Sequence, residues 1–300
     1  MLVPSDHLGY AEAAIHGHRV LPYDPAHPFG DGAEVADVLI PPFLPDAGLV
    51  DRAVELPKLR LVQLLTVGAD AWLGRLPDGV ALSTCRGAHS AATAEWVLAV
   101  LLACYRELPG FLADAGQGRW RPRATEGLFG KRVLVIGAGD VGRQVATRLL
   151  ACDAGVTMVG RSGGDGVHPV AELATLLPDH DAAVLIVPLT KETRGMVDAA
   201  FLAAMPDGAV LVNAARGPLV DTGALLAELS SGRLHAALDV TDPEPLPPDH
   251  PLWTVQNVLI TPHVGGSVFG LYRRAYAVAA AQIAAVAAGR EPDNLVRNGY

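Results

Sequence analysis

The stretch Val133–Leu150, VLVIGAGDVGRQVATRLL, joins an apolar strand to an amphipathic helix through a glycine-rich turn. Its glycines, Gly137, Gly139 and Gly142, have the spacing G-x-G-x-x-G. In dinucleotide-binding folds the first glycine of this pattern permits a tight turn, the second lets the backbone approach a pyrophosphate, and the third lets the helix pack on the strand. The pattern therefore predicts dinucleotide binding, and an ordinary strand-to-helix turn is the alternative.

Outward from this turn, short runs rich in Val, Leu and Ile alternate with helical stretches. Continuous apolar runs fit strands that are covered on both faces. We expect strands within residues 19–24, 35–42, 59–68 and 80–85, and then within 132–137, 156–160, 182–188, 209–215, 234–240 and 257–262. Between the two series we expect a helix over 90–108, with Ser90 and Thr93 as candidate caps and Pro109 as its stop. This alternation predicts an α/β fold with doubly wound parallel sheets.

The composition is that of a globular chain with a large core. The 300 residues are 50% apolar and 18% charged, which suits two domains of ordinary size. The formal net charge of -9 argues against a nucleic acid or an anionic membrane as partner, because the field of the whole molecule repels both. The longest apolar runs, 96–105 and 275–289, are shorter than the roughly 18 to 20 residues that cross a bilayer. Both runs are expected to be buried helices.

The cysteines Cys85, Cys104 and Cys152 have no spacing typical of a disulfide framework or a zinc site. We therefore expect them to be small buried residues, and we expect no metal centre. The N-terminal stretch MLVPSDHLGY has no basic region followed by an apolar run, so it does not resemble a secretory signal. These features favour a reducing cytoplasm.

A basic residue follows one of the expected strands, in MVGRSGG, Met158–Gly164. This strand ends at Gly160, twenty-three residues after Gly137, about where dinucleotide folds place the acid that binds the adenosine ribose. Gly160 has no side chain for that bond, whereas Arg161 and Ser162 supply a cation and a hydroxyl suited to a 2'-phosphate. NADP is therefore favoured over NAD. The alternative is that Arg161 is a solvated loop residue.

Polar side chains lie at the ends of the last three expected strands: Asn213 and Arg216, Asp239 and Glu244, and His263. Ligands of doubly wound sheets bind at this edge. Arg216 can bind a carboxylate and a carbonyl oxygen, and His263, supported by Glu244, can supply a proton. Taken singly, such a histidine is more often structural and such an arginine more often solvated.

At these residues the chain resembles the D-isomer-specific 2-hydroxyacid dehydrogenases. The resemblance runs through TVGADAW, AATAEWVLAVLLACYREL, GRW, LFGKRVLVIGAGDVG, VPLTKETRGMVD, LVNAARGPLVD, ALDVTDPEPLPPDHPLW and NVLITPHVGG. It covers most of the chain from about residue 35 to the C-terminus. The order of the Arg, Glu and His motifs makes it specific.

The resemblance implies a role for each matching residue. Arg216 would hold the carboxylate and carbonyl of a 2-oxo acid, His263 would protonate the carbonyl oxygen as hydride reaches C2, and Glu244 would raise the proton affinity of that histidine. The amides of Val67 and Gly68 would complete the carboxylate site. The residues expected along the cofactor are Gly137, Gly139, Asp140, Val141 and Gly142 at the pyrophosphate, Gly160, Arg161 and Ser162 at the ribose, Pro188 and Thr193 on the adenosine side, and Ala214, Ala215, Arg216, Asp239, His263, Gly265 and Gly266 at the nicotinamide half.

The resemblance also implies an architecture, a Rossmann cofactor domain inserted into a flavodoxin-like substrate domain. The substrate domain would comprise residues 1–92 and 272–300, and the cofactor domain residues 93–271. Two helices, near 91–108 and 266–288, would form the crossings, and closure about them would expel water before hydride transfer. Family members usually form homodimers through the cofactor domain, for which the apolar run WVLAVLLACY is suited. An intramolecular core helix explains this run equally well.

Within the family, formate dehydrogenases carry glutamine where Glu244 stands, and phosphite dehydrogenases carry a lysine in the loop here occupied by TVGAD, so both are disfavoured. NADP-preferring members that are similar in the GRS region often reduce glyoxylate or hydroxypyruvate, which is our first expectation; a bulkier 2-oxo acid is the alternative. A dinucleotide-sensing corepressor is a second class of function, and the complete Arg, Glu and His set favours turnover over it. An S-adenosylmethionine methyltransferase would share the glycine-rich turn but would not explain those three positions.

Overall fold

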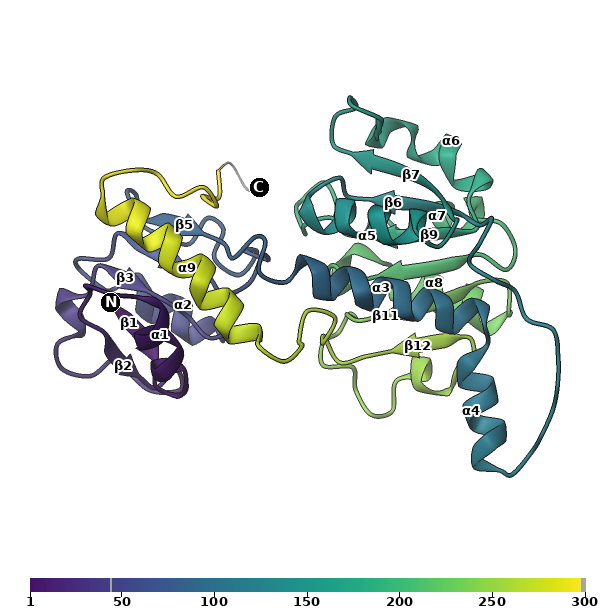
Figure 1. Cartoon of the computed structure of the whole chain (residues 1–300), viewed down its shortest axis with the longest axis horizontal. Coiled ribbons are helices and arrows are strands. Elements are labelled where there is room, and N and C mark those ends of the chain that lie inside the picture. The colour runs from purple at the N-terminus through teal and green to yellow at the C-terminus, as the bar shows by residue number, and fades with distance from the viewer. Residues whose placement is uncertain (44, 298–300) are drawn as a thin grey trace. The chain divides into compact units, whose positions relative to one another are not determined.

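The computed structural model describes residues 1–43 and 45–297, which form two compact units. Unit 1 consists of Met1–His89 and the described residues from Val268 onward, and unit 2 consists of Ser90–Ser267 (Figure 1). The chain therefore crosses between the units twice, after His89 and after Ser267. The crossings expected from sequence lie after residues 92 and 271.

Unit 2 is built on a seven-stranded parallel sheet of order β12-β11-β10-β9-β6-β7-β8. Counted from β6 as the first strand, this sheet has the order 3-2-1-4-5-6 of dinucleotide-binding folds, with β12 added at one edge. The strands are β6 Arg132–Ile136, β7 Gly155–Gly160, β8 Val167–Pro169, β9 Ala182–Leu185, β10 Val210–Asn213, β11 His235–Leu238 and β12 Val258–Ile260. The helices are α3 Ser90–Tyr105, α4 Leu108–Gly116, α5 Asp140–Leu150, α6 Leu173–Leu176, α7 Ala199–Ala204 and α8 Thr222–Ser230, with the 3-10 turns η3 Val170–Glu172, η4 Leu177–Asp179, η5 Gly217–Leu219 and η6 Pro251–Thr254.

Helices cover both faces of this sheet, because alternate residues of a strand point to opposite sides. Leu134 and Ile136 of β6 belong to a core shared with α7 and α8. Val133 and Val135 of the same strand belong to a second core, shared with α3 and α5. This double cover explains why the strands are apolar throughout, and it confirms the predicted doubly wound α/β class.

Unit 1 contains a five-stranded parallel sheet of order β2-β1-β3-β4-β5, the order of flavodoxin-like folds. One face is covered by α1 and α9 and the other by α2 (Figure 1). Because α9 comes from the end of the chain, the unit is discontinuous. Its elements are β1 Leu2–Pro4, η1 Ser5–His7, α1 Leu8–Ala14, β2 Leu21–Tyr23, η2 Ala33–Val35, β3 Val38–Leu39, α2 Ala47–Ala53, β4 Leu61–Gln63, β5 Ala81–Ser83 and α9 Leu271–Ala287.

Two strands lie outside the ranges expected from sequence, β1 in unit 1 and β8 in unit 2. β1 has three residues, all buried, and pairs with both β2 and β3. Runs this short show no alternation that distinguishes a strand from a loop. Their positions in the sheets come from pairing, β1 with β2 and β3 later in the chain and β8 with β7, the strand that precedes it.

The helix expected over 90–108 ends earlier, because α3 stops at Tyr105. Glu107 has φ of +48° and turns the chain into α4. Pro109 lies in the first turn of α4, so the prediction that it stops the preceding helix was wrong. A proline is tolerated there because the amide it lacks would have no helical partner.

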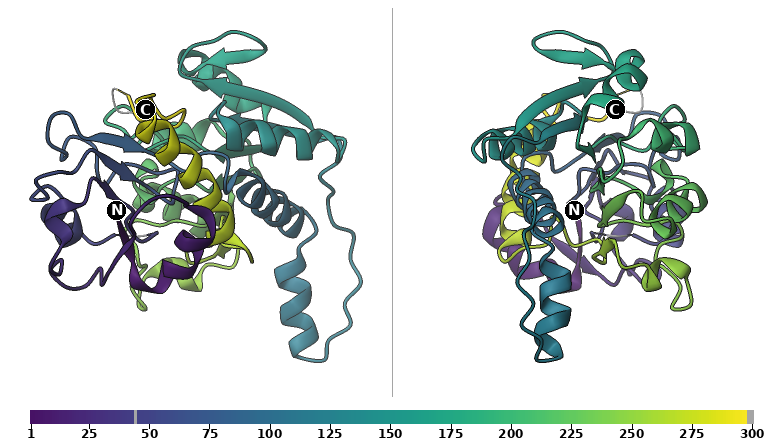
Figure 2. Two further views of the ribbon diagram at one scale, coloured as in Figure 1. Left: turned by 60° about the vertical axis from the view of Figure 1, so that its left-hand side comes forward. Right: turned by 90° about the vertical axis from the view of Figure 1, so that its right-hand side faces the viewer.

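The segment 108–130, here called the arm, comprises α4 and the connection that follows it (Figure 2). The arm exposes four large apolar side chains, Leu108 (47% exposed), Leu112 (72%), Trp120 (93%) and Phe129 (74%). Among the described residues no single helix is long and apolar enough to cross a bilayer; α3 and α4, bent by 67° at their break, pass this test of length and composition only as a pair.

Candidate active site

Gly137 and Gly142 shape the turn between β6 and α5. Gly137 has φ of +126° and donates its N–H to the Val159 carbonyl at 2.8 Å. A Cβ on Gly137 would lie 2.3 Å from the Ile186 carbonyl oxygen, and one on Gly142 would lie 1.8 Å from the Gly137 carbonyl oxygen. Neither position has room for a side chain, as the first and third glycines of a dinucleotide turn require.

Gly139 differs from both, because a Cβ there would meet no atom within 4 Å. Gly139 is the N-cap of α5, and no side chain caps this helix. The first turn, which begins with Asp140 and Val141, therefore offers its amides to a ligand. The residues fit a pyrophosphate, since a helix N-terminus attracts an anion and Gly139 leaves space for its approach.

β7 ends at Gly160, and the two side chains that follow it, Arg161 and Ser162, are exposed. A Cβ on Gly160 would lie 3.1 Å from Val167 Cγ1. The position is therefore crowded for the carboxylate side chain that NAD-binding folds place there. The residue that directly follows the strand end, Arg161, carries a guanidinium.

The loop after β9 carries the other two residues expected on the adenosine side. Thr193 Oγ1 donates to the Pro188 carbonyl at 2.7 Å and accepts from the Thr190 amide at 2.8 Å. The hydroxyl of Thr193 thus closes the loop on itself. In the same loop a hydrogen bond from Thr190 lowers the pKa of the Glu192 carboxyl, and the charge of Arg161 lowers it further. Arg161 is therefore close enough to this loop to act on its charges.

Asn213, buried at the end of β10, organises the loop that carries Arg216. Its Nδ2 donates to the Arg216 carbonyl at 2.9 Å, and its Oδ1 accepts from the Ala215 amide at 3.1 Å. A Cβ on Gly217 would lie 1.9 Å from the Thr241 carbonyl oxygen. The loops that follow β10 and β11 are therefore in direct backbone contact.

Asp239, at the end of β11, holds the loop that carries His263. Its carboxylate accepts from Thr261 Oγ1 at 2.6 Å and from the amides of Val264 and Gly265, each at 2.8 Å. The His263 amide donates to the Asp239 carbonyl at 2.8 Å. These bonds hold His263 at φ of +54°, which is strained for a residue with a Cβ. Positioning of His263 is thus a role of Asp239 that the sequence did not reveal; its predicted contact with the cofactor stays a prediction.

His263 and Glu244 form a close pair, with 2.7 Å between Nδ1 and Oε1. Their side chains are 22% and 38% exposed. The hydrogen bond from His263 is the main cause that lowers the pKa of the Glu244 carboxyl; the charge of His263, the Thr241 amide and the Arg216 guanidinium lower it further. An ionised Glu244 that accepts from Nδ1 leaves Nε2 of the imidazole to exchange a proton with a ligand. Unit 2 therefore brings Arg216, Glu244 and His263 together at the carboxyl ends of its strands.

Val67 and Gly68 follow β4 in unit 1, whereas the other predicted site residues belong to unit 2. Thr66 Oγ1 donates to the Gly68 carbonyl at 2.9 Å, and the Thr66 carbonyl accepts from the Cys85 amide at 2.8 Å. Among the described residues neither the Val67 amide nor the Gly68 amide donates a hydrogen bond. These amides can therefore serve an anion, which is the role expected of them.

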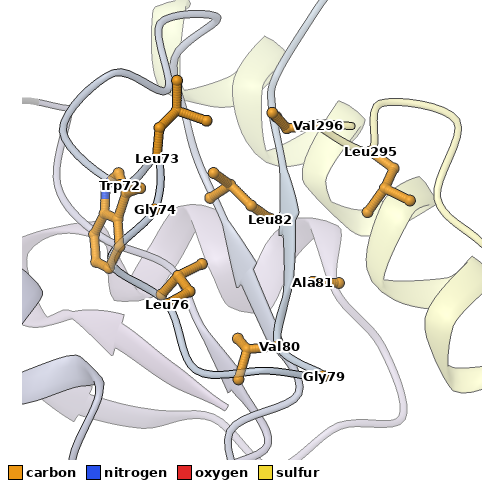
Figure 3. Close-up of a pocket in the computed structure, with 10 residues that line it drawn as sticks. All are labelled: Trp72, Leu73, Gly74, Leu76, Gly79, Val80, Ala81, Leu82, Leu295 and Val296. Atoms are coloured by element: carbon orange, nitrogen blue, oxygen red, sulfur yellow. The ribbon is translucent and has the colours of Figure 1, made fainter. Parts of the chain in front are cut away.

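Unit 1 also contains a cavity of about 450 Å³ (Figure 3). The residues that line it are Trp72, Leu73, Gly74, Leu76, Gly79, Val80, Ala81, Leu82, Leu295 and Val296. None of these side chains is ionisable, so the cavity offers neither an acid nor a base nor a charge for a carboxylate. Within the described residues no group of three or more His, Cys, Asp or Glu side chains is placed to hold a metal ion.

Sequence reasoning assigned no task to two residues that build the site. Asn213 was recognised only as a polar strand end, and Gly217 only as part of a motif. The φ of Gly217 is not in the left-handed region. A side chain is excluded there because its Cβ would overlap the Thr241 carbonyl. No local signal marks such a contact, because it joins loops after different strands.

A family model described as D-isomer specific 2-hydroxyacid dehydrogenase, NAD binding domain, matches residues 98–265. A glyoxylate reductase from Thermofilum pendens is 33% identical over 268 residues, which are 84% of this chain and 78% of that protein. A hydroxypyruvate reductase from Thermotoga maritima is 35% identical over 204 residues, which are 65% of this chain and 66% of that protein. The chain spans less of two D-3-phosphoglycerate dehydrogenases, 43% of that from Methanocaldococcus jannaschii and 37% of that from Archaeoglobus fulgidus, at 35% and 36% identity.

The fold is also similar to that of a solved D-isomer specific 2-hydroxyacid dehydrogenase from Xanthobacter autotrophicus Py2, in complex with NADPH and MES. The TM-score is 0.86 at 34% sequence identity, and the comparison covers 99% of this chain and 97% of that one.

Proposed function

Because the chain belongs to the D-isomer specific 2-hydroxyacid dehydrogenase family, we propose that it transfers a hydride from NADPH to C2 of a small 2-oxo acid and so forms the D-2-hydroxy acid. The observation that carries the proposal is the 2.7 Å contact between His263 Nδ1 and Glu244 Oε1, with the charge of Arg216 acting on the same carboxyl. Unit 2 is assigned the cofactor and unit 1 the substrate.

In the proposed reaction, Arg216 binds the substrate carboxylate and the C2 carbonyl oxygen through the planar fork of its guanidinium. The dinucleotide, when bound, supplies the hydride that reaches C2. His263, protonated on Nε2, donates that proton to the carbonyl oxygen as negative charge develops there. Glu244 stabilises the protonated imidazole and fixes its orientation. Oxidation of the hydroxy acid uses the same groups in reverse.

The preference for NADP rests on the end of β7. Gly160 carries no acid, and Arg161 and Ser162 supply the cation and the hydroxyl for a 2'-phosphate. The NADPH complex of the Xanthobacter relative supports this choice. The pyrophosphate would lie at Gly139 and the first turn of α5, where the structure leaves space.

Glyoxylate and hydroxypyruvate are the proposed substrates. The names of two curated relatives, a glyoxylate reductase and a hydroxypyruvate reductase, support them. The amides of Val67 and Gly68, which donate no hydrogen bond among the described residues, are proposed to bind the substrate carboxylate. A bulkier 2-oxo acid would use the same Arg216 and His263 chemistry.

The experiment is a steady-state comparison of NADPH with NADH over glyoxylate, hydroxypyruvate and phenylpyruvate, followed by the absorbance of the reduced cofactor. We expect oxidation that depends on the 2-oxo acid, with higher kcat/KM for NADPH and for the two small substrates. Absence of oxidation with the whole panel, from a protein shown to bind NADPH, would contradict the enzymatic proposal. A higher kcat/KM for phenylpyruvate would show that the preferred substrate is a bulkier 2-oxo acid, while the proposed reaction would stand.

We also propose a homodimer formed through unit 2, in a reducing compartment. The exposed apolar side chains of the arm support the dimer, because large aromatic and aliphatic side chains often anchor protein interfaces. The three free cysteines support the compartment. Burial raises the pKa of Cys85 to about 12, so this thiol stays protonated and unreactive.

A further inference from the structure

Both crossings between the units run beside the beginning of α9. The chain leaves unit 1 after His89 and returns to it at Val268, three residues before α9 starts at Leu271. Arg274, in the first turn of this helix, reaches both segments. Its Nε donates to the Ala88 carbonyl at 3.2 Å, and its Nη1 donates to the Phe269 carbonyl at 3.1 Å. One guanidinium therefore joins the last residues before the first crossing to the first residues after the second.

The local backbone is arranged to admit this side chain. Gly270, the N-cap of α9, has φ of +80°, and a Cβ there would lie 3.1 Å from Arg274 Nη1. The Arg274 amide donates to the Gly270 carbonyl at 3.1 Å, which starts the helix. Farther along α9, Ala275, Tyr276 and Ala279 are buried in the core of unit 1. The guanidinium thus extends from a helix that cannot shift without disturbing that core.

Two further hydrogen bonds hold the segment before the first crossing to α9 and to the residues that follow α9. Cys85 Sγ donates to the Ala275 carbonyl at 3.1 Å, and Asn294 Nδ2 donates to the Arg86 carbonyl at 3.1 Å. Arg274 contacts Ala88, and the next residue, His89, lies with its Nε2 2.7 Å from the Leu65 carbonyl oxygen before the chain leaves the unit. The segment after the second crossing depends on Arg274 more heavily, since Phe269 itself is fully exposed.

We propose that Arg274 is a clamp that makes the two crossings move together as one hinge. Two carbonyls that share a rigid guanidinium cannot rotate independently without breaking one of its hydrogen bonds. A lysine is a single point donor on a flexible stem, so it can satisfy one carbonyl at a time. The proposal rests on the proposed function, because hinge movement between the units is what brings a substrate domain to a cofactor domain and excludes water before hydride transfer.

Amide hydrogen exchange on the full-length protein tests the clamp without any assay of turnover. The variants are Arg274→Ala and Arg274→Lys, with Arg273→Ala as the matched control. Arg273 is the preceding residue of α9, is exposed, and makes no hydrogen bond or ion pair among the described residues. In Arg274→Ala we expect exchange to quicken about tenfold in the peptides that cover 85–91 and in those that cover 266–272, because local opening follows the loss of anchoring bonds. The control should match wild type, and Arg274→Lys should lie between them.

Several outcomes would overturn the clamp. Faster exchange in only one of the two segments would show that they are not coupled through Arg274. Faster exchange spread through the sheet and helices of unit 1 would show a loss of stability in place of a hinge effect. Exchange equal to that of wild type in both segments would show that the contacts are unimportant.

Steady-state kinetics of Arg274→Ala tests whether the clamp affects the proposed reaction. Arg274→Ala should lower kcat for the 2-oxo acid about tenfold, while the Kd of NADPH stays near wild type because the proposed cofactor residues belong to unit 2. An unchanged kcat together with quickened exchange would refute the link to closure. If wild type reduces no 2-oxo acid, the proposed function fails while the exchange result still decides whether the clamp exists.

Discussion

At the scale of single residues, the site depends on two carboxylates with different tasks. Asp239 is buried, and its carboxylate accepts hydrogen bonds from three donors of the loop that carries His263. Glu244 is partly exposed and pairs with the imidazole itself. One carboxylate holds the loop that carries the histidine, and the other contacts the imidazole at Nδ1. The bonds of Asp239 hold His263 at its strained φ of +54°.

His263→Ala should lower kcat by roughly a hundredfold or more, because it removes the general acid. The Kd of NADPH should change little, since the turn at α5 and the end of β7 are untouched. Steady-state kinetics and fluorescence titration with NADPH measure the two quantities. A kcat equal to that of wild type would remove His263 from the mechanism.

Glu244→Gln tests the pair through its pH dependence. The pKa of Glu244 is lowered from 4.5, so the folded protein keeps the carboxylate ionised at pH values where the unfolded chain protonates it. Its stabilising contribution is therefore complete above pH 4.5 and is lost as the pH falls through the folded pKa. We expect the difference in free energy of unfolding between wild type and Glu244→Gln to shrink below pH 4.5, measured by urea denaturation across a pH series. A difference that grows with acidity would contradict the pairing.

Arg161→Ala should raise the KM for NADPH about tenfold or more and leave the KM for NADH nearly unchanged, because only NADPH carries the 2'-phosphate. NADH serves as the internal control for damage to the rest of the cofactor site. Equal effects on both cofactors would make Arg161 a solvated loop residue and would remove the argument for NADP without touching the reaction.

At the scale of elements, the turn between β6 and α5 contains two glycines that lack a side chain for different reasons. Gly142 has no room for one, and Gly139 is expected to leave room for a ligand. Gly142 faces the backbone of the turn at a distance that excludes any side chain, whereas Gly139 faces open space. The two glycines belong to one motif, yet their reasons for lacking a side chain differ. The Gly137 carbonyl explains the absence of a side chain at Gly142, and the proposed approach of a pyrophosphate would explain it at Gly139.

Gly139→Ala should therefore leave the free energy of unfolding within about 0.5 kcal/mol of wild type, while weakening NADPH binding about tenfold or more. Gly142→Ala should instead cost roughly 3 kcal/mol or more of stability, because its methyl group overlaps a backbone carbonyl. Chemical denaturation and NADPH titration of the two variants make the comparison. Unchanged NADPH affinity in Gly139→Ala would place the pyrophosphate elsewhere.

At the scale of the whole molecule, the arm combines one residue of the core of unit 2, Leu128, with several exposed apolar side chains. It exposes Leu108, Leu112, Trp120 and Phe129 to solvent. The helix α4 and the connection after it extend away from the rest of unit 2 (Figure 2). Exposed aromatic side chains are typical anchors of protein interfaces. A second copy of the chain is the partner that the proposed homodimer requires.

Replacing Leu112 and Trp120 together by Glu should convert the dimer to a monomer, because two charges would be buried without partners. Sedimentation equilibrium at micromolar concentration measures the mass. Leu150→Glu is the matched control, since Leu150 is an exposed leucine of unit 2 outside the arm. A double variant that dimerises as tightly as wild type would place the interface away from the arm.

Much of this fold is predictable because its signals are local. The turn at Gly137 and the apolar strands of unit 2 follow from spacing and hydrophobicity within a few residues. The grouping of Arg216, Glu244 and His263 also follows, because parallel strands place their carboxyl ends at one edge. The strands β1 and β8 are different: each has three residues, and each is a strand only through its pairing, β1 with β2 and β3 and β8 with the preceding strand β7.

The sequence by itself determined the fold class, the family and the residue types at the strand ends, since these depend on periodicity and on motifs that each occupy a short stretch. Only the tertiary structure decided what holds those residues in place. The carboxylate of Asp239 meets donors more than twenty residues later, Gly217 meets the carbonyl of Thr241, and Arg274 joins two segments that lie 181 residues apart, from Ala88 to Phe269. Such contacts leave no mark on the neighbouring sequence, because the energy that selects the residue comes from atoms that folding alone brings within reach.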